Sequence, residues 1–336
     1  MIIQKNISLR PYNSFHLDVK TETFVAVQNA DDLQVLLRDQ NKKPALILGG
    51  GSNILFTKNI DGLVLKLEIK GIEEVKEDNA HVYVRTGAGE NWHTFVEYTL
   101  AHNWGGLENL SLIPGSVGAA PIQNIGAYGV ELKDVFYELE AYDRKENKVY
   151  AFGVNDCRFG YRDSIFKSGE KGRYIVLNVT FILKKIPVLH TSYGAIRDEL
   201  RKMNIQTPTI QNISQAVIQI RKSKLPDPAV IGNAGSFFKN PVVNQEVFLS
   251  LSMNHADMPS YPHEGKSVKL AAGWLIEHCG WKGYRKGDAG VHADQALVLV
   301  NYGNATGKEI LDLSEKIMTS VKHKFGVKLE REVNIF

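Results

Sequence analysis

The sequence predicts a protein of mixed α and β structure with two or three domains. Its 336 residues are enough for that number of domains. Residues 135–142 and 148–154 are rich in strand-forming residues and flank a polar turn, which is typical of two antiparallel strands. Residues 308–325 place apolar side chains three and four positions apart, as one side of a helix requires.

The other elements of the N-terminal two thirds are predicted from the same strand and helix patterns of apolar residues. A short amphipathic helix is expected over 31–40, where three leucines share one face. A strand over 45–48 leads into a glycine turn, and Gly105 is a suitable stop for the helix that begins at Trp92. The remaining expected elements are a strand over 82–89, that helix over 92–103 and a β-rich segment over 173–183.

The C-terminal third begins after a proline-containing linker. A helix over 213–223 ends just before the sequence KLPDP, and a domain boundary is expected there. Beyond it the sequence predicts a helix over 268–279, a buried strand over 294–300 and the helix over 308–325. The tail 327–335 alternates as a strand, with Glu332 on its polar face.

The composition is that of an ordinary globular protein. A net charge of +3, with no run of Lys or Arg longer than two, argues against a nucleic-acid partner. Two cysteines without a pairing pattern suit the reducing cytoplasm, and no signal peptide is recognised. The ten histidines are scattered, so no metal site is expected.

Residues 109–130 form a charge-free segment of small residues, NLSLIPGSVGAAPIQNIGAYGV. Its glycines and alanines leave a bare backbone, and Pro114 and Pro121 prevent one continuous helix. Prolines and amides also make a membrane span improbable. A flat or anionic group could approach such a backbone closely. A tightly packed set of buried loops explains the segment equally well.

A second glycine-rich segment, GGGSN at 49–53, follows the predicted strand. Successive backbone N–H groups in such a turn can form an anion-binding nest. The segment lacks the Lys-Ser/Thr of a phosphate-binding P-loop and the glycine spacing of a dinucleotide-binding fingerprint. A simple turn is the more common explanation for three glycines.

Polar residues elsewhere are ambiguous when taken singly. Arg162 can be a surface cation, Ser236 a turn serine and Glu332 a solvated charge. The cations Arg221 and Lys224 end a helix, where the helix dipole favours positive charge.

Taken together, these segments resemble the UDP-N-acetylenolpyruvoylglucosamine reductase family. The matching pieces occur in the family's order and cover essentially the whole chain: GGGSN (49–53), IPGSVGAAPIQNIGAYG (113–129), YRDSIFK (161–167), KLPDP (224–228), GNAGSFFKNP (232–241), GVHADQALVLVN (290–301) and LEREV (329–333). Each piece is weak alone, but seven in order are highly specific. The segment TSYGAI (191–196) also resembles the tyrosine loop of one of the family's two subtypes.

The resemblance implies an α+β fold of four parts. Residues 1–70 and 71–224 would form a two-part FAD-binding region of the vanillyl-alcohol-oxidase and p-cresol-methylhydroxylase type. Residues 225–325 would form an α/β substrate domain, and 326–336 a strand that returns to the active site. The implied activity is the NADPH-dependent, FAD-mediated reduction of UDP-N-acetylglucosamine enolpyruvate to UDP-N-acetylmuramate in peptidoglycan precursor synthesis. The protein would be cytoplasmic and monomeric, with non-covalent FAD.

The resemblance also assigns site residues. The catalytic positions match Arg162, Ser236 and Glu332. The substrate positions match Tyr128, Tyr161, Tyr193, Arg221, Lys224, Asn240 and Gln295. FAD is expected to bind at Gly49, Gly50, Gly51, Ser52, Asn53, Gly115, Ser116, Gly118, Ala119, Ile122, Asn124, Gly126 and Ala127.

The implied chemistry gives the three catalytic residues distinct roles. Hydride addition to an enol ether leaves negative charge beside a carboxylate, and Arg162 is a permanently charged donor for it. Ser236 would then protonate carbon, with Lys224 or Lys239 stabilising its alkoxide. Glu332 would act as a protonated donor or orient Arg162 or a water.

Two alternatives remain open at this point. One is a flavin enzyme of the same fold that oxidises a small alcohol or phenol, which would often hold its FAD covalently. The other is a nucleotide-binding regulatory protein without turnover. The combined presence of Arg162, Ser236 and Glu332 argues against the second.

Overall fold

The computed structural model describes residues 2–38, 44–263 and 265–336, which form two compact units. The first unit contains residues 2–7, 20–38, 44–51 and 60–223. The second contains 8–19, 52–59, 224–263 and 265–336, so two short N-terminal segments belong with the C-terminal third of the chain.

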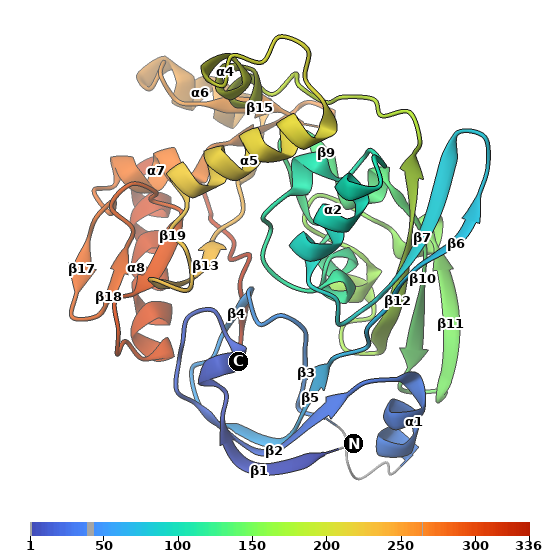
Figure 1. Cartoon of the computed structure of the whole chain (residues 1–336). Helices are drawn as coiled ribbons and strands as arrows, with labels where there is room; N and C mark the ends of the chain where they lie inside the picture. The colour runs from blue at the N-terminus through green and yellow to red at the C-terminus, as the bar shows by residue number, and fades with distance from the viewer. Residues whose placement is uncertain (1, 39–43, 264) are drawn as a thin grey trace. The chain divides into compact units, whose positions relative to one another are not determined.

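Two main sheets form most of the described part of the first unit (Figure 1). The smaller has the order β1-β2-β5-β3, and β5 pairs in parallel with both β2 and β3. Its elements are β1 (Ile3–Ser8), β2 (Lys20–Val27), β3 (Leu46–Leu48), β5 (Ile60–Leu67) and the helix α1 (Ala30–Arg38). The predicted helix over 31–40 is therefore present up to Arg38, and its last two residues lie outside the described residues.

The larger sheet is antiparallel and has the order β11-β10-β12-β7-β6. Its strands are β6 (Ile72–Glu77), β7 (His81–Gly87), β10 (Phe136–Asp143), β11 (Lys148–Gly153) and β12 (Tyr174–Lys184). Successive side chains of its strands point to opposite faces, and apolar side chains are buried on both faces. Tyr142, Ile175 and Leu177 pack with α1 and the smaller sheet. Phe181 packs against Trp92 and Phe95 of α2 (Trp92–Ala101), which lies beside the sheet in Figure 1.

The charge-free segment adds to this second core as short turns rather than as one helix, as its prolines require. Further helices are α3 (Val154–Cys157), α4 (Gly194–Lys202) and α5 (Ile210–Lys224), and the last two share a core around Ile213 and Val217. The helix predicted over 213–223 thus begins one turn earlier. The strands β8 (Gly126–Ala127) and β9 (Val130–Glu131) form a two-stranded antiparallel sheet. The short helical turns of this unit are η2 (Glu108–Leu110), η3 (Val117–Ala119), η4 (Pro121–Gln123), η5 (Leu132–Asp134) and η6 (Ile165–Gly169), and η1 (Arg10–Tyr12) belongs to the second unit.

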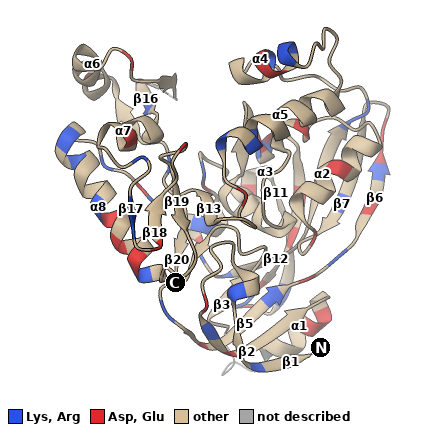
Figure 2. Ribbon diagram, turned by 60° about the vertical axis from the view of Figure 1, so that its left-hand side comes forward, with Lys and Arg blue, Asp and Glu red and all other residues tan. Residues whose placement is uncertain are grey.

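The second unit contains an antiparallel sheet of order β13-β19-β18-β17 and a smaller sheet of order β14-β16-β15. The helix α8 carries charges of both signs on its exposed side (Figure 2). The elements are β4 (Ile54–Leu55), β13 (Gly232–Ser236), β14 (Val242–Asn244), α6 (Gln245–Asn254), β15 (Ser260–Pro262), β16 (Ser267–Leu270), α7 (Ala272–His278), β17 (Arg285–Lys286), β18 (Ala289–Val291), β19 (Val298–Asn301), α8 (Gly307–Phe325) and β20 (Asn334–Ile335).

Three predictions for this unit were wrong in extent. Residues 268–270 belong to β16, so the predicted helix over 268–279 is shorter, because these residues pair with Val242 and Val243 of β14. The buried strand begins at Val298, since 294–297 form a turn. The tail is a strand only over 334–335, where it pairs in parallel with β4. Its backbone instead follows residues 237–239, as described below.

Candidate functional site

The start of α2 holds the first part of the charge-free segment in place. The indole of Trp92 donates to the Leu110 carbonyl over 2.9 Å. The Trp92 N–H donates to the Gly115 carbonyl over 3.0 Å, and the Val117 N–H donates to the Glu90 carbonyl over 2.9 Å. The backbone from Leu110 to Val117 is therefore fixed along one helix end.

The two glycine-rich segments pack directly on each other. A Cβ at Gly50 would lie 2.6 Å from Gly115 Cα, and one at Gly49 would lie 2.6 Å from Ser116 Oγ. At Gly50 the neighbour is backbone, so a side chain fits only if the backbone moves, whereas at Gly49 a side chain fits only if the Ser116 hydroxyl moves. Contact between the two loops accounts for these glycines, in agreement with the interpretation as buried loops.

One polar group in this region has no partner within the described part of the chain. The Ser116 hydroxyl is buried and makes no hydrogen bond there. A buried polar group without a partner costs about 1–3 kcal/mol. A bound polar ligand would satisfy this hydroxyl, so the turn at Gly115 and Ser116 fits a cofactor site.

Asn124 serves the loop itself through its side chain. It is fully buried, with φ of +44°. Its Nδ2 donates to Glu131 Oε2 over 3.0 Å and to the Gly160 carbonyl over 3.1 Å. Its Oδ1 accepts from the Lys133 N–H over 3.1 Å. Its side chain is therefore engaged within the loop, and its own N–H donates to the Pro121 carbonyl over 3.4 Å.

The segment YRDSIFK lies against the second part of the charge-free segment. Arg162 Nη2 donates to the Gly126 carbonyl over 2.6 Å. Ser164 Oγ donates to the Ile122 carbonyl over 2.6 Å. The Arg162 guanidinium also lies 5.5 Å from the centre of the Tyr161 ring. The fold thus brings the candidate residues Tyr161 and Arg162 beside the predicted FAD-binding residues.

Three predicted substrate residues of the first unit form a cluster. The Tyr128 and Tyr193 rings meet edge to face with centres 5.4 Å apart. Arg221, in the last turn of α5, hydrogen-bonds to Tyr128. Burial raises the pKa of Tyr128, and the charge of Arg221 opposes that rise. Tyr128 is therefore a neutral hydroxyl held by a cation.

In the second unit the tail brings Glu332 close to Ser236. The Glu332 N–H donates to the carbonyl of Phe237, the residue after Ser236, over 2.9 Å. Phe238 forms a bridge with Arg331, and Asn53 Nδ2 donates to the Glu332 carbonyl over 3.2 Å. Two residues nearly 100 positions apart in the sequence therefore lie on neighbouring backbone segments.

Of the remaining candidates of this unit, Asn240 and Gln295 lie near the start of α7, and Lys224 lies at the end of α5. Asn240 Oδ1 accepts from the Ala272 N–H over 2.9 Å, which ties this side chain to the helix start. Gln295 Oε1 accepts from the Leu297 N–H over 3.4 Å and would lie 3.3 Å from a Cβ at Gly273. Lys224 is the last residue of α5, where the second unit begins.

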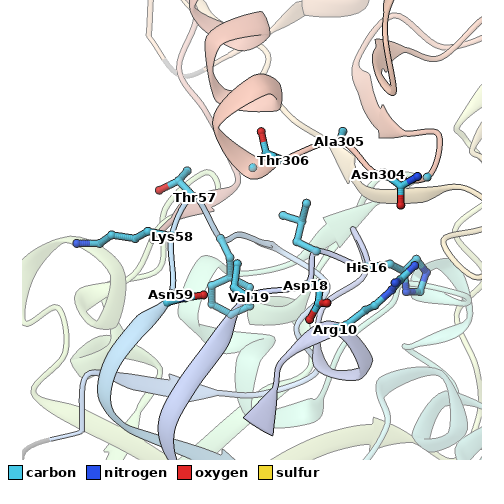
Figure 3. A pocket seen from close by; sticks show the side chains of 14 residues that line it. Arg10, His16, Asp18, Val19, Thr57, Lys58, Asn59, Asn304, Ala305 and Thr306 are labelled. Carbon is cyan, nitrogen blue, oxygen red and sulfur yellow. The ribbon is translucent and has the colours of Figure 1, made fainter. Parts of the chain in front are cut away.

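A cavity of about 560 Å³ also lies in the second unit (Figure 3). Arg10, His16 and Asp18 line one part of it, and Thr306 stands at the start of α8 above it. None of the predicted site residues lines this cavity.

The described residues contain neither a candidate metal-binding cluster nor a candidate membrane-spanning helix. Within 2–38, 44–263 and 265–336, no group of three or more His, Cys, Asp or Glu side chains could hold a metal ion. Over the same ranges, no helix has both the length and the hydrophobicity needed to cross a membrane.

Comparison with known proteins first defines the class of protein to which the chain belongs. Residues 21–150 match the model of the FAD-binding domain, which includes both glycine-rich segments. The 6-hydroxy-D-nicotine oxidase of Arthrobacter nicotinovorans has the same fold, with a TM-score of 0.52 at 12% identity over 97% of this chain and 86% of that one. The chain thus contains an FAD-binding domain and shares the fold of that oxidase, and the predicted fold class is confirmed.

The remainder of the chain specifies the family. Residues 227–336 match the C-terminal domain of UDP-N-acetylenolpyruvoylglucosamine reductase. The reductase of Flavobacterium johnsoniae is 49% identical over 100% of both chains, and that of Chromobacterium violaceum is 52% identical over 97% of both. The reductase structure from Thermus caldophilus shares the fold over 100% of both chains, with a TM-score of 0.70 at 22% identity. The chain belongs to the UDP-N-acetylenolpyruvoylglucosamine reductase family of FAD-dependent oxidoreductases.

Proposed function

We propose that this protein reduces UDP-N-acetylglucosamine enolpyruvate to UDP-N-acetylmuramate, with FAD as cofactor and NADPH as reductant. The observation that carries the proposal is the 49% identity to a reductase of that name across all 336 residues. The aligned length spans the segments that contain Arg162, Ser236 and Glu332. The product is a precursor of peptidoglycan.

The candidate cofactor residues would hold FAD between the two glycine-rich segments and along residues 115–127. These residues would hold FAD, which would supply hydride transfer between the nicotinamide and the substrate. The Ser116 hydroxyl, which has no hydrogen-bond partner among the described residues, supports this position. The charge-free composition supports it as well, because an unpaired charge beside an apolar ring would be costly.

Arg162 would stabilise the negative charge that hydride addition leaves on the substrate beside its carboxylate. Its Nη2 is anchored on the Gly126 carbonyl at 2.6 Å, so the fork is oriented before substrate binds. Preorganised donors of this kind are usually the largest catalytic contribution.

Ser236 would donate the proton that completes the reduction at carbon. Serine is a weak acid, so a cation must stabilise its alkoxide, and Lys224 and Lys239 are the candidates. Lys239 Nζ lies 3.5 Å from Glu330, on the segment that also carries Glu332. Glu332 would act as a protonated donor or orient Arg162 or a water.

Tyr193 would cover the substrate's nucleotide, as the tyrosine loop of that family subtype implies. The edge-to-face contact of Tyr193 with Tyr128 supports this role. Lys224 and Arg221 would favour the diphosphate. Arg221 is already engaged with Tyr128 and with the Leu112 carbonyl at 3.2 Å, so it would act in part through Tyr128.

The wider context is part of the same proposal. The four-part division at residues 70, 224 and 325, a cytoplasmic monomer and the absence of a nucleic-acid partner all remain predictions. Since the nicotinamide and the substrate both need the flavin N5 and the chain has one substrate domain, they would use one pocket in turn. Parallel initial-velocity lines are expected, and intersecting lines would contradict the shared pocket.

The decisive experiment combines a spectrum with a rate. The purified protein should show bound-flavin absorption and should oxidise NADPH faster when UDP-N-acetylglucosamine enolpyruvate is added. A colourless protein that does not take up FAD would overturn the proposal. Denaturation should release free FAD, whereas a covalent adduct would favour an oxidase of alcohols or phenols. Binding without turnover would favour a regulatory protein.

A further inference from the structure

Leu112 has an unusual backbone conformation that two side chains hold. Its φ is +58°, in the left-handed region that bulky residues rarely adopt. Its N–H donates to His93 Nδ1 over 3.0 Å. Its carbonyl accepts from Arg221 Nε over 3.2 Å. One residue is thus held from α2 on its amide side and from α5 on its carbonyl side.

The hydrogen bond from Leu112 fixes the chemical state of His93. Because Nδ1 accepts from an N–H, the ring must be neutral, with its proton on Nε2. Nε2 faces Glu97 Oε1 at 3.6 Å. A protonated ring would place a second N–H against that of Leu112, and the hydrogen bond would be lost.

The surroundings of His93 favour the neutral ring. Burial is the largest cause that lowers its pKa, and the positive charges of Arg221 and Lys222 on α5 add to it. Glu97, on the same helix as His93, acts in the opposite direction. The net effect is a pKa below the usual value of histidine.

Leu112 lies three residues before the turn at Gly115 and Ser116. Gly115 has φ of +126°, and its carbonyl is held by the Trp92 N–H at 3.0 Å. Ser116 carries the buried hydroxyl without a partner in the described chain. His93 and Trp92 are adjacent, so one helix end controls both the entry to this turn and the turn itself.

We propose that His93 is a positioning residue for FAD: its neutral Nδ1 holds Leu112, and through it the turn at Gly115 and Ser116, in the conformation that binds the cofactor. The proposal rests on FAD lying at this turn. It makes cofactor retention sensitive to acid, because protonation of His93 removes the acceptor. It is separate from the catalytic roles of Arg162, Ser236 and Glu332.

The test follows the rate of FAD release from the holoenzyme by flavin fluorescence, from about pH 8 to pH 5. His93→Asn replaces the acceptor nitrogen with an amide oxygen at nearly the same place, but does not titrate. Release from the wild type should accelerate in acid, roughly two- to tenfold for one lost hydrogen bond. His93→Asn should lack this acid dependence, and His93→Ala should release FAD fast throughout.

Glu97→Gln and His102→Asn complete the test. Removing the Glu97 charge should shift the acid limb to lower pH, because that charge favours protonated His93. His102 ends the same helix and bonds to the Tyr98 carbonyl, so His102→Asn should behave as wild type. An acid limb that persists unchanged in His93→Asn would overturn the proposal. In that case a holoenzyme that still reduces the enolpyruvyl substrate would leave the proposed function intact.

Discussion

Arg162 Nη2 donates a 2.6 Å hydrogen bond to the carbonyl of Gly126, thirty-six residues earlier in the chain. Arg162 itself has φ of +55°, another left-handed conformation at a non-glycine residue. A Cβ at Gly126 would lie 3.1 Å from Arg162 Nη1. The charge-free segment therefore provides both the anchor and the space for the cation that the chemistry requires.

Replacing Arg162 with lysine should separate charge from orientation. Lysine keeps the charge but cannot form the fork that holds Gly126 while presenting donors to substrate. We expect substrate reduction to fall by about 100-fold or more, with NADPH reduction of bound FAD retained. Stopped-flow absorbance of each half-reaction measures this. Arg158→Lys is the control, since Arg158 is exposed and also has left-handed φ of +47°. Equal losses in both half-reactions would contradict the assigned role.

Replacing Gly50 with alanine should force the two glycine-rich segments apart. The new Cβ would lie 2.6 Å from Gly115 Cα, which is backbone and cannot rotate away. Such overpacking typically costs about 1–3 kcal/mol. We expect a lower melting temperature together with weaker FAD retention, measured by thermal unfolding and by flavin release. Gly194→Ala is a matched control, because nothing lies within 4 Å of its added Cβ. Unchanged flavin retention in Gly50→Ala would separate this contact from the cofactor site.

Replacing Ser236 with alanine should remove only the proton donor. NADPH should still reduce the bound FAD, while reduction of the enolpyruvyl substrate falls by about 10²–10⁴-fold. Rapid-mixing measurements of the two half-reactions distinguish these steps. Ser250→Ala, on the exposed surface of α6, should leave both rates unchanged. If both half-reactions survive equally in Ser236→Ala, another group donates the proton.

The stability of the first unit should fall in acid through Asp143. Burial by itself raises the pKa of this fully buried carboxyl group, but Arg173 at 2.6 Å and two backbone N–H groups outweigh burial and hold it below its usual value. The lowered pKa stabilises the fold above the unfolded value, and this contribution disappears as pH falls through the folded pKa. Unfolding by denaturant at several pH values should show the loss.

Arg173→Leu tests the same pair at neutral pH. It leaves a buried carboxylate without its cation, and such changes typically cost about 3–5 kcal/mol. Arg201→Leu is the control, because its pair with Asp198 is exposed on both sides. Equal effects of the two substitutions on the free energy of unfolding would show that the Asp143 pair adds nothing.

Strongly periodic elements were predictable because local sequence alone sets them. The helix expected over 308–325 is α8, Gly307–Phe325, with Thr306 capping its start and Gly326 in left-handed conformation at its end. Shorter apolar segments were not, since residues 268–270 suit a helix or a strand equally well. Pairing with Val242 and Val243 decided for the strand. The prediction of the tail as one strand was wrong, because Arg331 pairs with Phe238 whereas residues 334–335 pair with β4.

The sequence by itself determined the family, the FAD cofactor and the residue types available for catalysis, because ordered motifs along the whole chain record those properties. Only the tertiary structure decided which side chains and backbone groups contact one another. It showed that Gly49 and Gly50 make room for residues 115–116, and that His93 accepts from Leu112. A lone pair and a missing Cβ act over about 3 Å, and only folding brings residues distant in sequence that close.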